Sequence, residues 1–440
     1  MKRVSVACVF GTRPDAVKMA PVIKELERHP DQIRNIRIST CQNKEMLEQV
    51  LRVFDVTPDY DLQLMTDRQT LTDLTTRALG ALVPVLEAEQ PDLVIAQGDT
   101  TTTFVASLAA FYAKAKFLHV EAGLRTDNKW NPFPEEMNRR LTGRLTDFHC
   151  APTELSAANL RAEGVDPATI RVTGNTVVDA LHLVVAQDYA FEDAAVQAFV
   201  HTPGRIVLVT AHRRENWGEP MQHICEAILE MVNNHDDVRV IFPMHKNPVV
   251  RETVVPILGG HPRILLTEPQ EYFPFIHLMR RSTFVLTDSG GAQEEAPGLG
   301  KPVVILRETT ERPEGVHAGN AVLVGTDKAK IAAATNALLS DDAVYARMSQ
   351  AVSPYGQGDS AVQIPLLHRQ RDQEASEKKK NHAAHVLAGG LGAAAGRLSG
   401  WRDTSENASE VPPRKRPSSA AATVPEYSTS SPRLAPRLIP

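Results

Sequence analysis

Residues 284–304, FVLTDSGGAQEEAPGLGKPVV, contain two consecutive glycines close to two acidic residues. An apolar run ends there and is followed by Ser289, Gly290 and Gly291, with Glu295 one helical turn further on. Glycines after a parallel strand let a ligand approach the backbone, and the N-terminus of the following helix attracts a diphosphate. Glu295 could accept hydrogen bonds from ribose hydroxyls. The stretch is therefore either a nucleotide-diphosphate site or a tight turn with solvated acids.

Residues 9–18, VFGTRPDAVK, show a similar pattern near the N-terminus. Pro14 suits the first turn of a helix, where a missing N–H has no cost. Arg13 and Lys18 would place two cations near that helix start, where they could face an anion. Basic helix starts are also common without a ligand, so this stretch alone decides nothing.

More acids and cations follow other strand-like runs. They are Asp99 in QGDTTTTF, Glu121 in HVEAGLRT, Glu135, Glu136 and Arg139 in FPEEMNRR, and His212 and Arg213 in LVTAHRREN. Any one of them could be a helix cap or a salt-bridge partner. Their shared position is more informative, because doubly wound sheets bind ligands at the carboxyl ends of their strands.

The elements that must position these residues are short β-branched runs alternating with helical patterns. The expected strands are Val4–Phe10, Ile36–Thr40, Leu93–Gln97, Phe117–Val120, Ile170–Thr173, Ile206–Thr210, Val238–Pro243, Phe284–Thr287 and Pro302–Leu306. Continuous apolar strands of this kind predict parallel sheets covered on both faces. Two sets, parted near 175–179 or 201–204, predict two doubly wound α/β domains.

Composition fits a soluble, cytoplasmic protein of more than one domain. The chain has 440 residues, of which 42% are hydrophobic and 23% charged, and its net charge of −5 argues against a general nucleic-acid-binding surface. The four cysteines lack metal-ligand spacing, so we expect no metal site. No signal peptide and no long uninterrupted apolar stretch is recognisable, so no membrane contact is expected.

The last part of the chain has a different composition. Residues 377–380 are EKKK, residues 387–396 are rich in Ala and Gly, and residues 412–417 are PPRKRP. Such a sequence has little to bury, so residues 368–440 are expected to be disordered. The basic cluster could be a nuclear or nucleic-acid signal, but clusters of this kind are weak indicators.

Taken together, these stretches closely resemble the non-hydrolysing UDP-N-acetylglucosamine 2-epimerases of bacteria. The matching stretches are GTRP (11–14), GDTTTT (98–103), HVEAGLRT (119–126), PEE and NR (134–139), GNT (174–176), HRREN (212–216), DSGG and QEEAP (288–297) and TTERPE (309–314). The resemblance runs from Lys2 to Ile364. It implies a GT-B fold of two Rossmann-like domains across a cleft, in a homodimer. The implied divisions are 1–175, 176–350, a segment 351–367 crossing back to the first domain, and the tail.

The resemblance also implies a reaction. UDP-N-acetylglucosamine loses UDP by anti elimination across C1–C2, and re-addition to the resulting glycal gives UDP-N-acetylmannosamine for cell-envelope polysaccharides. No cofactor is required. The implied catalytic residues are Lys18, Asp99, Glu121, Glu135, Arg139 and His212, and the implied UDP-binding residues are Arg13, Ser289, Gly290, Gly291, Glu295 and Arg312. The acids at 99, 121 and 135 stabilise a cationic C1 and move the proton, in an unassigned division of labour.

Two features depart from the family pattern. Members bind a second UDP-N-acetylglucosamine as an activator, and the matching positions are Gln42, Glu136, Arg213 and His245, but TCQNKEML (40–47) differs from the usual pattern around Gln42. At the other end, Pro365 interrupts the expected terminal helix, because proline lacks an N–H and clashes with the preceding turn.

Three other functions remain open from the sequence. A GT-B glycosyltransferase would also bind a UDP-sugar, a hydrolysing 2-epimerase would release free N-acetylmannosamine, and a catalytically inactive homologue would act as a UDP-sugar sensor. The intact acids at 99, 121 and 135 favour the epimerase.

Overall fold

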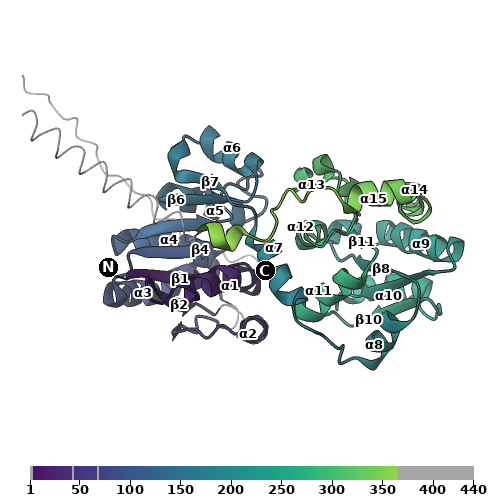
Figure 1. Ribbon diagram of the computed structural model, residues 1–440, viewed down its shortest axis with the longest axis horizontal. Helices are drawn as coiled ribbons and strands as arrows, with labels where there is room; N and C mark the ends of the chain where they lie inside the picture. The colour runs from purple at the N-terminus through teal and green to yellow at the C-terminus, as the bar shows by residue number, and fades with distance from the viewer. Residues whose placement is uncertain (1–2, 42–43, 67–68, 365–440) are drawn as a thin grey trace, which may run out of the picture. The chain divides into compact units, whose positions relative to one another are not determined.

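The structure is a computed structural model, and it describes residues 3–41, 44–66 and 69–364. Within these residues the chain forms two parallel β-sheets with helices on both faces of each sheet (Figure 1). The expected α/β class is therefore confirmed. No described helix has the length and apolar character needed to span a membrane.

The first sheet has the strand order β3-β2-β1-β4-β5-β6-β7. Its strands are β1 (Val4–Phe10), β2 (Ile33–Ser39), β3 (Tyr60–Asp61), β4 (Leu93–Gln97), β5 (Lys116–Val120), β6 (Phe148–Ala151) and β7 (Ile170–Val172). Its helices are α1 (Arg13–Glu27), α2 (Lys44–Val53), α3 (Leu71–Glu89), α4 (Thr101–Tyr112), α5 (Glu135–Leu145) and α6 (Glu154–Ala162), with a 3-10 turn at Pro167–Thr169. The order reverses at β1 and β4, and the loops after these strands therefore open on a binding crevice.

The second sheet repeats the pattern in the order β10-β9-β8-β11-β12-β13. Its strands are β8 (Arg205–Thr210), β9 (Val238–Pro243), β10 (Ile264–Thr267), β11 (Phe284–Thr287), β12 (Val303–Ile305) and β13 (Ala321–Leu323). The helices of this half are α7 (Thr176–Val185), α8 (Ala194–His201), α9 (Glu219–Asn234), α10 (Pro248–Leu258), α11 (Tyr272–Arg281), α12 (Gly290–Gly298), α13 (Pro313–Ala318), α14 (Lys328–Ser340) and α15 (Asp342–Ser349), with a 3-10 turn at Arg214–Asn216. Here the order reverses at β8 and β11.

Burial explains why the central strands were recognisable in the sequence. Every residue of β4 and β9 is buried, as expected for strands covered on both faces. Four strands were not predicted, namely β3, β6, β10 and β13. They have two to four residues each, too few to show a clear pattern. Strand β2 also starts at Ile33 and not at Ile36, and it ends at Ser39.

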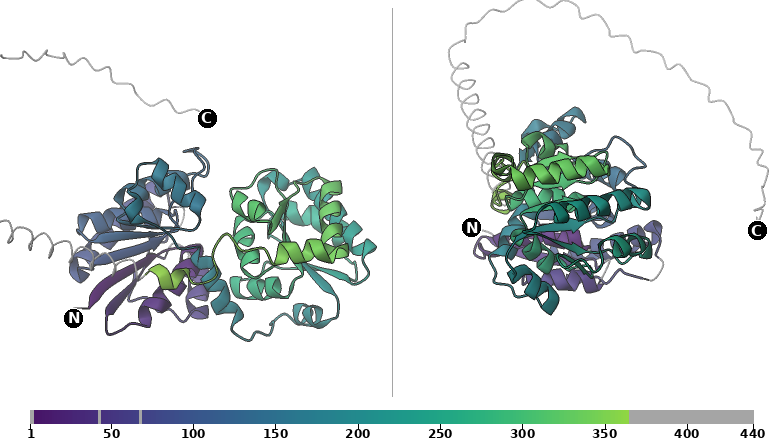
Figure 2. Two further views of the ribbon diagram at one scale, coloured as in Figure 1. Left: turned by 45° about the horizontal axis from the view of Figure 1, so that its top comes forward. Right: turned by 90° about the vertical axis from the view of Figure 1, so that its right-hand side faces the viewer.

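The chain passes between the two sheets twice. It first passes at Gly174 and Asn175, where α7 begins, and it returns through residues 351–364, which run from α15 back to the first sheet (Figures 1 and 2). The Asn175 N–H donates to the Tyr355 carbonyl at 2.7 Å, and the Ala361 N–H donates to Asp179 Oδ1 at 2.9 Å. These bonds join the two passages to each other.

Gly174 is required at this crossing. Its φ is +83°, and a Cβ there would lie 2.7 Å from Ser360 Oγ and 3.1 Å from the Gly356 Cα. Only glycine fits both the conformation and the close approach. The divisions at 175, 350 and 367 remain our proposal, and the expectation of disorder for residues 368–440 falls outside the described residues.

Candidate functional site

A cavity of about 600 Å³ lies between loops of the two sheets. Its lining includes Arg13, Pro14, Val17, Lys18, Thr210, His212, His245, Gln270, Tyr272, Ser289, Gly291, Glu294, Glu295 and Arg312. The lining thus contains five of the six residues predicted to bind UDP, together with Lys18 and His212. The sixth, Gly290, lies beside it at the start of α12.

The two helix N-termini at this cavity are built differently. Thr12 caps α1 through a capping box with Asp15, and Asp15 also accepts hydrogen bonds from the Gly11 and Thr12 N–H groups. Burial raises the pKa of Asp15 to about 6. Ser289 caps α12 without a side-chain hydrogen bond. Its hydroxyl therefore remains available to a ligand at a helix start that favours anions.

Gly290 permits the close approach of Arg312 to this helix. A Cβ at Gly290 would lie 2.7 Å from Arg312 Nη1, whereas a Cβ at Gly291 would meet nothing nearer than 3.9 Å. The first glycine thus makes room for a protein cation. The second leaves open backbone beside the cavity.

Glu295 lies at the cavity wall, one turn into α12. Its side chain is buried, and burial together with the neighbouring Glu294 raises its pKa to about 7. Tyr272 lies in the same wall, and burial raises its pKa well above the usual value. The carboxyl group can therefore accept or donate hydrogen bonds near neutral pH.

Asp288 holds His212, and sequence reasoning did not assign it a role. Its Oδ2 accepts hydrogen bonds from the His212 and Arg213 N–H groups at 2.8 Å each and from Asn216 Nδ2 at 3.0 Å. Its Oδ1 lies 3.5 Å from His212 Nδ1, and Asp288 is fully buried. Burial lowers the pKa of His212, and Asp288 opposes that effect. With Nδ1 turned to Asp288, Nε2 is the nitrogen left for a ligand.

The buried Glu121 forms an ion pair with Lys18, which lines this cavity. Lys18 Nζ donates to Glu121 Oε2, and Asn175 Nδ2 donates to the same oxygen at 3.1 Å. Burial raises the pKa of Glu121, although Lys18 acts in the opposite direction. Glu121 has a φ of +64°, which costs a residue with a side chain roughly 1–2 kcal/mol. Such strain is typical of functional positions.

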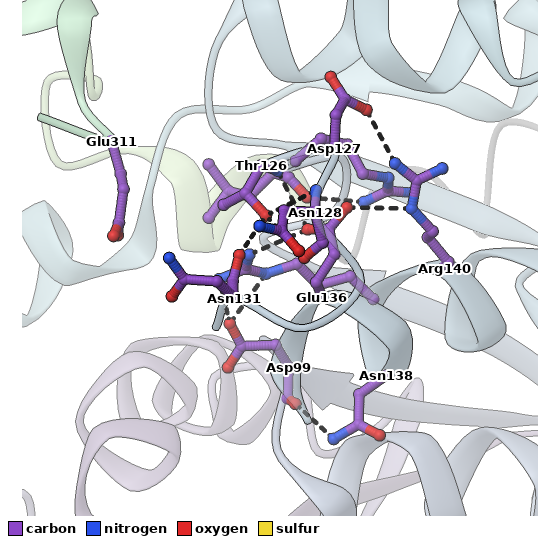
Figure 3. Close-up of polar contacts among 12 residues, drawn as sticks. Asp99, Thr126, Asp127, Asn128, Asn131, Glu136, Asn138, Arg140 and Glu311 are labelled. Carbon is purple, nitrogen blue, oxygen red and sulfur yellow. Dashed lines mark hydrogen bonds and ion pairs between the residues drawn. The ribbon is translucent and has the colours of Figure 1, made fainter. Parts of the chain in front are cut away.

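Asp99 is held by two neighbouring residues of α5. Arg139 Nε donates to Asp99 Oδ2 at 2.9 Å, and Asn138 Nδ2 donates to the Asp99 carbonyl at 2.9 Å (Figure 3). The carboxylate is about a quarter exposed. It also lies close enough to Glu121 to raise the pKa of that group.

His119 stabilises the turn at Gly98 and Asp99. Its Nε2 lies 2.7 Å from the Gly98 carbonyl, so this nitrogen carries the proton and donates it. The side chain is buried, and burial lowers the pKa of His119 to about 4. Gly98 itself has a φ of +81°, which suits glycine. A neutral histidine thus fixes the turn that carries Asp99.

Glu135 is placed differently from the other two acids. It begins α5 and is partly exposed, and none of the described residues gives its side chain a hydrogen bond or an ion pair. Whether it joins Asp99 and Glu121 at a substrate is therefore still a prediction.

The role predicted for the four activator positions stays a prediction. Gln42 lies outside the described residues. Glu136 is fully buried and accepts hydrogen bonds from the Thr126 N–H at 3.1 Å and Arg140 Nε at 3.0 Å, and its Oε2 lies 3.4 Å from Arg139 Nη1 (Figure 3). Both oxygens of the Glu136 carboxylate therefore have partners within the protein. The His245 ring stacks on His212 at 5.7 Å and lines the cavity.

Sequence reasoning assigned no role to Glu294, Asn175 or Asp288. All three belong to stretches that match the family, and Asp288 also ends the apolar run at 284–287, so each was visible without a role. Among the described residues, no group of three or more His, Cys, Asp or Glu is arranged to hold a metal ion.

Comparison with known proteins identifies the family. A family model described as UDP-N-acetylglucosamine 2-epimerase matches residues 24–366. The UDP-N-acetylglucosamine 2-epimerase of Bacillus subtilis is 48% identical over 366 residues, which are 83% of this chain and 94% of that protein.

Two solved structures share the fold. The Neisseria meningitidis UDP-GlcNAc 2-epimerase bound to UDP-GlcNAc is 45% identical, with a TM-score of 0.74, over 83% of this chain and 100% of that one. The Methanocaldococcus jannaschii enzyme in complex with UDP-GlcNAc and UDP is 32% identical, with a TM-score of 0.66, over 83% of this chain and 100% of that one. These neighbours agree with the expected GT-B-like pairing of Rossmann-like halves. This chain belongs to the UDP-N-acetylglucosamine 2-epimerase family.

Proposed function

We propose that this protein interconverts UDP-N-acetylglucosamine and UDP-N-acetylmannosamine. One observation carries the proposal beyond family membership. The cations Arg13, Lys18 and Arg312 line a single cavity together with His212, and Lys18 is paired with the buried Glu121. A diphosphate that leaves a sugar would meet these cations while carboxylates lie next to the sugar ring.

The chemistry must avoid direct ionisation of C2, because no carbonyl group is adjacent to that carbon. In the proposed anti elimination, a base removes the C2 proton and the C–H electron pair forms the C1–C2 double bond. The C1–O bond breaks, and its electron pair leaves on the β-phosphate oxygen of UDP. Return of UDP to C1 and of a proton to the opposite face of C2 completes the epimerisation.

We assign the residues the roles that the family resemblance implies, and the lining of the cavity supports this assignment. Arg13, Ser289, Gly291 and Arg312 would bind the diphosphate, with Gly290 making room for Arg312 and Glu295 accepting from the ribose. His212 would neutralise charge on the leaving group. Asp99, Glu121 and Glu135 would stabilise the cationic C1 and exchange the proton, with Arg139 holding Asp99.

Deuterated water provides the test. Purified protein incubated with UDP-N-acetylglucosamine in deuterium oxide should incorporate deuterium at C2 of both UDP-sugars, as mass spectrometry and NMR would show. A glycosyltransferase or a sensor would leave C2 unlabelled, and a hydrolysing enzyme would accumulate free N-acetylmannosamine. Either result would overturn the proposal.

The proposal also includes a homodimer in the cytoplasm that supplies cell-envelope polysaccharide synthesis, as the family resemblance suggests. Light scattering coupled to size-exclusion chromatography would test the dimer, which should have about twice the 48.2 kDa mass of one chain. Activation by excess UDP-N-acetylglucosamine through Arg213 and His245 would appear as sigmoidal kinetics.

A further inference from the structure

Glu294 is a buried carboxylate in the cavity wall to which the roles above give no task. It is 3% exposed and lies on α12, next to Glu295. Its Oε1 accepts a hydrogen bond from Arg312 Nε at 2.6 Å. Its Oε2 lies 3.8 Å from Lys18 Nζ and 3.4 Å from Asn175 Nδ2. One carboxylate therefore contacts groups that belong to both halves of the site.

Lys18 and Asn175 also hold Glu121. Both donate to Glu121 Oε2, so Glu121 after β5 and Glu294 on α12 face the same two donors. The amide of Asn175 has a fixed orientation, because its Oδ1 accepts from the Val177 N–H at 3.0 Å as the cap of α7. Its NH₂ group must therefore face the carboxylates.

The cluster consists of two basic and two acidic side chains. Lys18 and Arg312 are cationic, and Glu121 and Glu294 are the facing acids. Burial alone would raise the pKa of Glu294, but Arg312 and Lys18 together hold it below its usual value, so the group is ionised. A buried ionised carboxylate that loses its charge leaves its cations without a partner.

We propose that Glu294 is a positioning residue that links the diphosphate-binding Arg312 to Glu121 through Lys18 and Asn175. The inference rests on the proposed function and deepens it. Glu294 competes with a bound diphosphate for Arg312 and Lys18, so its charge opposes UDP binding. The same charge attracts Lys18, which therefore lies between Glu294 and Glu121. Lys18 in turn holds Glu121 where the sugar would bind. Binding and turnover should therefore respond to its removal in opposite ways.

Glu294→Gln tests this directly, because it keeps the size of the side chain and removes its charge. We expect UDP affinity by calorimetry to rise by up to about tenfold. We expect kcat to fall about 100-fold, the scale for a misplacement near 1 Å at a reacting group. KM should not rise. Unchanged kcat would overturn the proposal, and so would a loss of UDP affinity in parallel with kcat.

Glu311→Gln is a matched control. Glu311 Oε2 lies 3.5 Å from Arg312 Nη1, but the side chain is 43% exposed and the described structure gives it no contact with Lys18 or Asn175. Removing this charge should change kcat less than about twofold, as is usual for exposed pairs. An equal loss of kcat in both variants would show that negative charge beside Arg312 matters without the contacts to Lys18 and Asn175, which also overturns the link.

A second variant protects the test against misfolding. Asn175→Ser keeps a good N-cap for α7 but removes the amide bridge between the two acids. We expect kcat to fall about tenfold at nearly unchanged Tm and UDP affinity, and the double variant with Glu294→Gln to fall by less than the product of the two. Wild-type kcat in Asn175→Ser would contradict the link even if Glu294→Gln does not fold.

These outcomes separate the inference from the proposed function. A wild-type protein that binds UDP but does not exchange the C2 proton would remove the epimerase. The UDP affinities of wild type, Glu294→Gln and Glu311→Gln would still test the competition for Arg312, and weaker UDP binding by Glu294→Gln would overturn it.

Discussion

Asp99 and Glu121 end neighbouring strands, yet the groups around them differ. Asp99 is about a quarter exposed and is held by the guanidinium of Arg139. Glu121 is buried and pairs with the ammonium of Lys18. Burial raises the pKa of Glu121, and the two carboxylates therefore lie in different electrostatic environments. This difference makes separate roles at the two faces of a sugar ring feasible.

The first prediction concerns Asp99→Asn. Turnover should fall by a factor of at least about 100, because the group acts on the sugar and in the transition state. UDP affinity should stay within about twofold, since Asp99 is not among the residues that line the cavity. Steady-state kinetics and UDP calorimetry would check both. Wild-type turnover would exclude Asp99 from the mechanism.

The second prediction concerns Glu295→Ala. Losing charge-assisted hydrogen bonds to ribose should weaken UDP binding by about 1–3 kcal/mol. Calorimetry with UDP and with uridine would measure the loss, which should be present for both ligands because both carry the ribose. Unchanged affinity for both would refute the ribose assignment.

At the scale of elements, β5 and β6 place two buried histidines side by side. His119 of β5 pairs in register with His149 of β6. Both are about 1% exposed, and burial lowers the pKa of His119 to about 4 and that of His149 to about 3. The unfolded chain therefore binds more protons than the fold below pH 6.5, so stability is lost as the pH falls from 6.5 towards these values.

The third prediction follows from this pair. Between pH 7 and pH 5, the free energy of unfolding of wild type should fall by about 2 kcal/mol more than that of His149→Met. The reason is that methionine cannot bind a proton in the unfolded chain. His119 stays intact, since it holds the Asp99 turn. Urea unfolding at both pH values would measure the difference. The exposed His317→Met should show no such pH-dependent gain, and an equal gain there would contradict the explanation.

The elements also show how far the sequence was sufficient. Long buried strands such as β4 and β9 were predicted with their bounds, because continuous apolar runs need both faces covered. Short strands such as β6, with a histidine in FHCA, carried no such pattern. Asp99, Glu121 and His212 were singled out because each lies just after a strand.

Supporting residues were harder to predict. Glu294 and Asn175 are 119 positions apart, and no local pattern shows that they meet. Asp288 ends an apolar run and looks like an ordinary turn residue until the loop after β8 folds over it. Contacts between distant segments depend on packing of the two sheets, which spacing in the sequence does not encode.

At the scale of the whole molecule, the folded site is complete well before the end of the chain. Arg312 is the last residue assigned to it, and the family match ends at residue 366. Residues 351–364 are nevertheless part of the fold, since Tyr355, Ala361 and Ile364 are each at most 5% exposed.

The fourth prediction compares two truncations. Deleting residues 376–440 should leave epimerisation and Tm unchanged, because no assigned residue is removed. Deleting residues 351–440 should lower the free energy of unfolding by about 2–5 kcal/mol or more. The lower figure is the scale of losing one large buried side chain. Thermal melting and the deuterium assay would distinguish them. A drop of several degrees in the shorter deletion would show that the tail supports the fold.

The paired crossings also limit how relatives can recombine. A chimaera with one junction near residue 175 would draw Gly174 from one parent and Gly356 from the other, although their backbones approach within van der Waals distance. An exchange of residues 176–350 as one block keeps Gly174, Asn175, Tyr355 and Gly356 from the same parent. Block exchanges of this kind should yield folded hybrids more often than chimaeras with one junction. The two halves can therefore evolve separately only if the two connecting segments are inherited together.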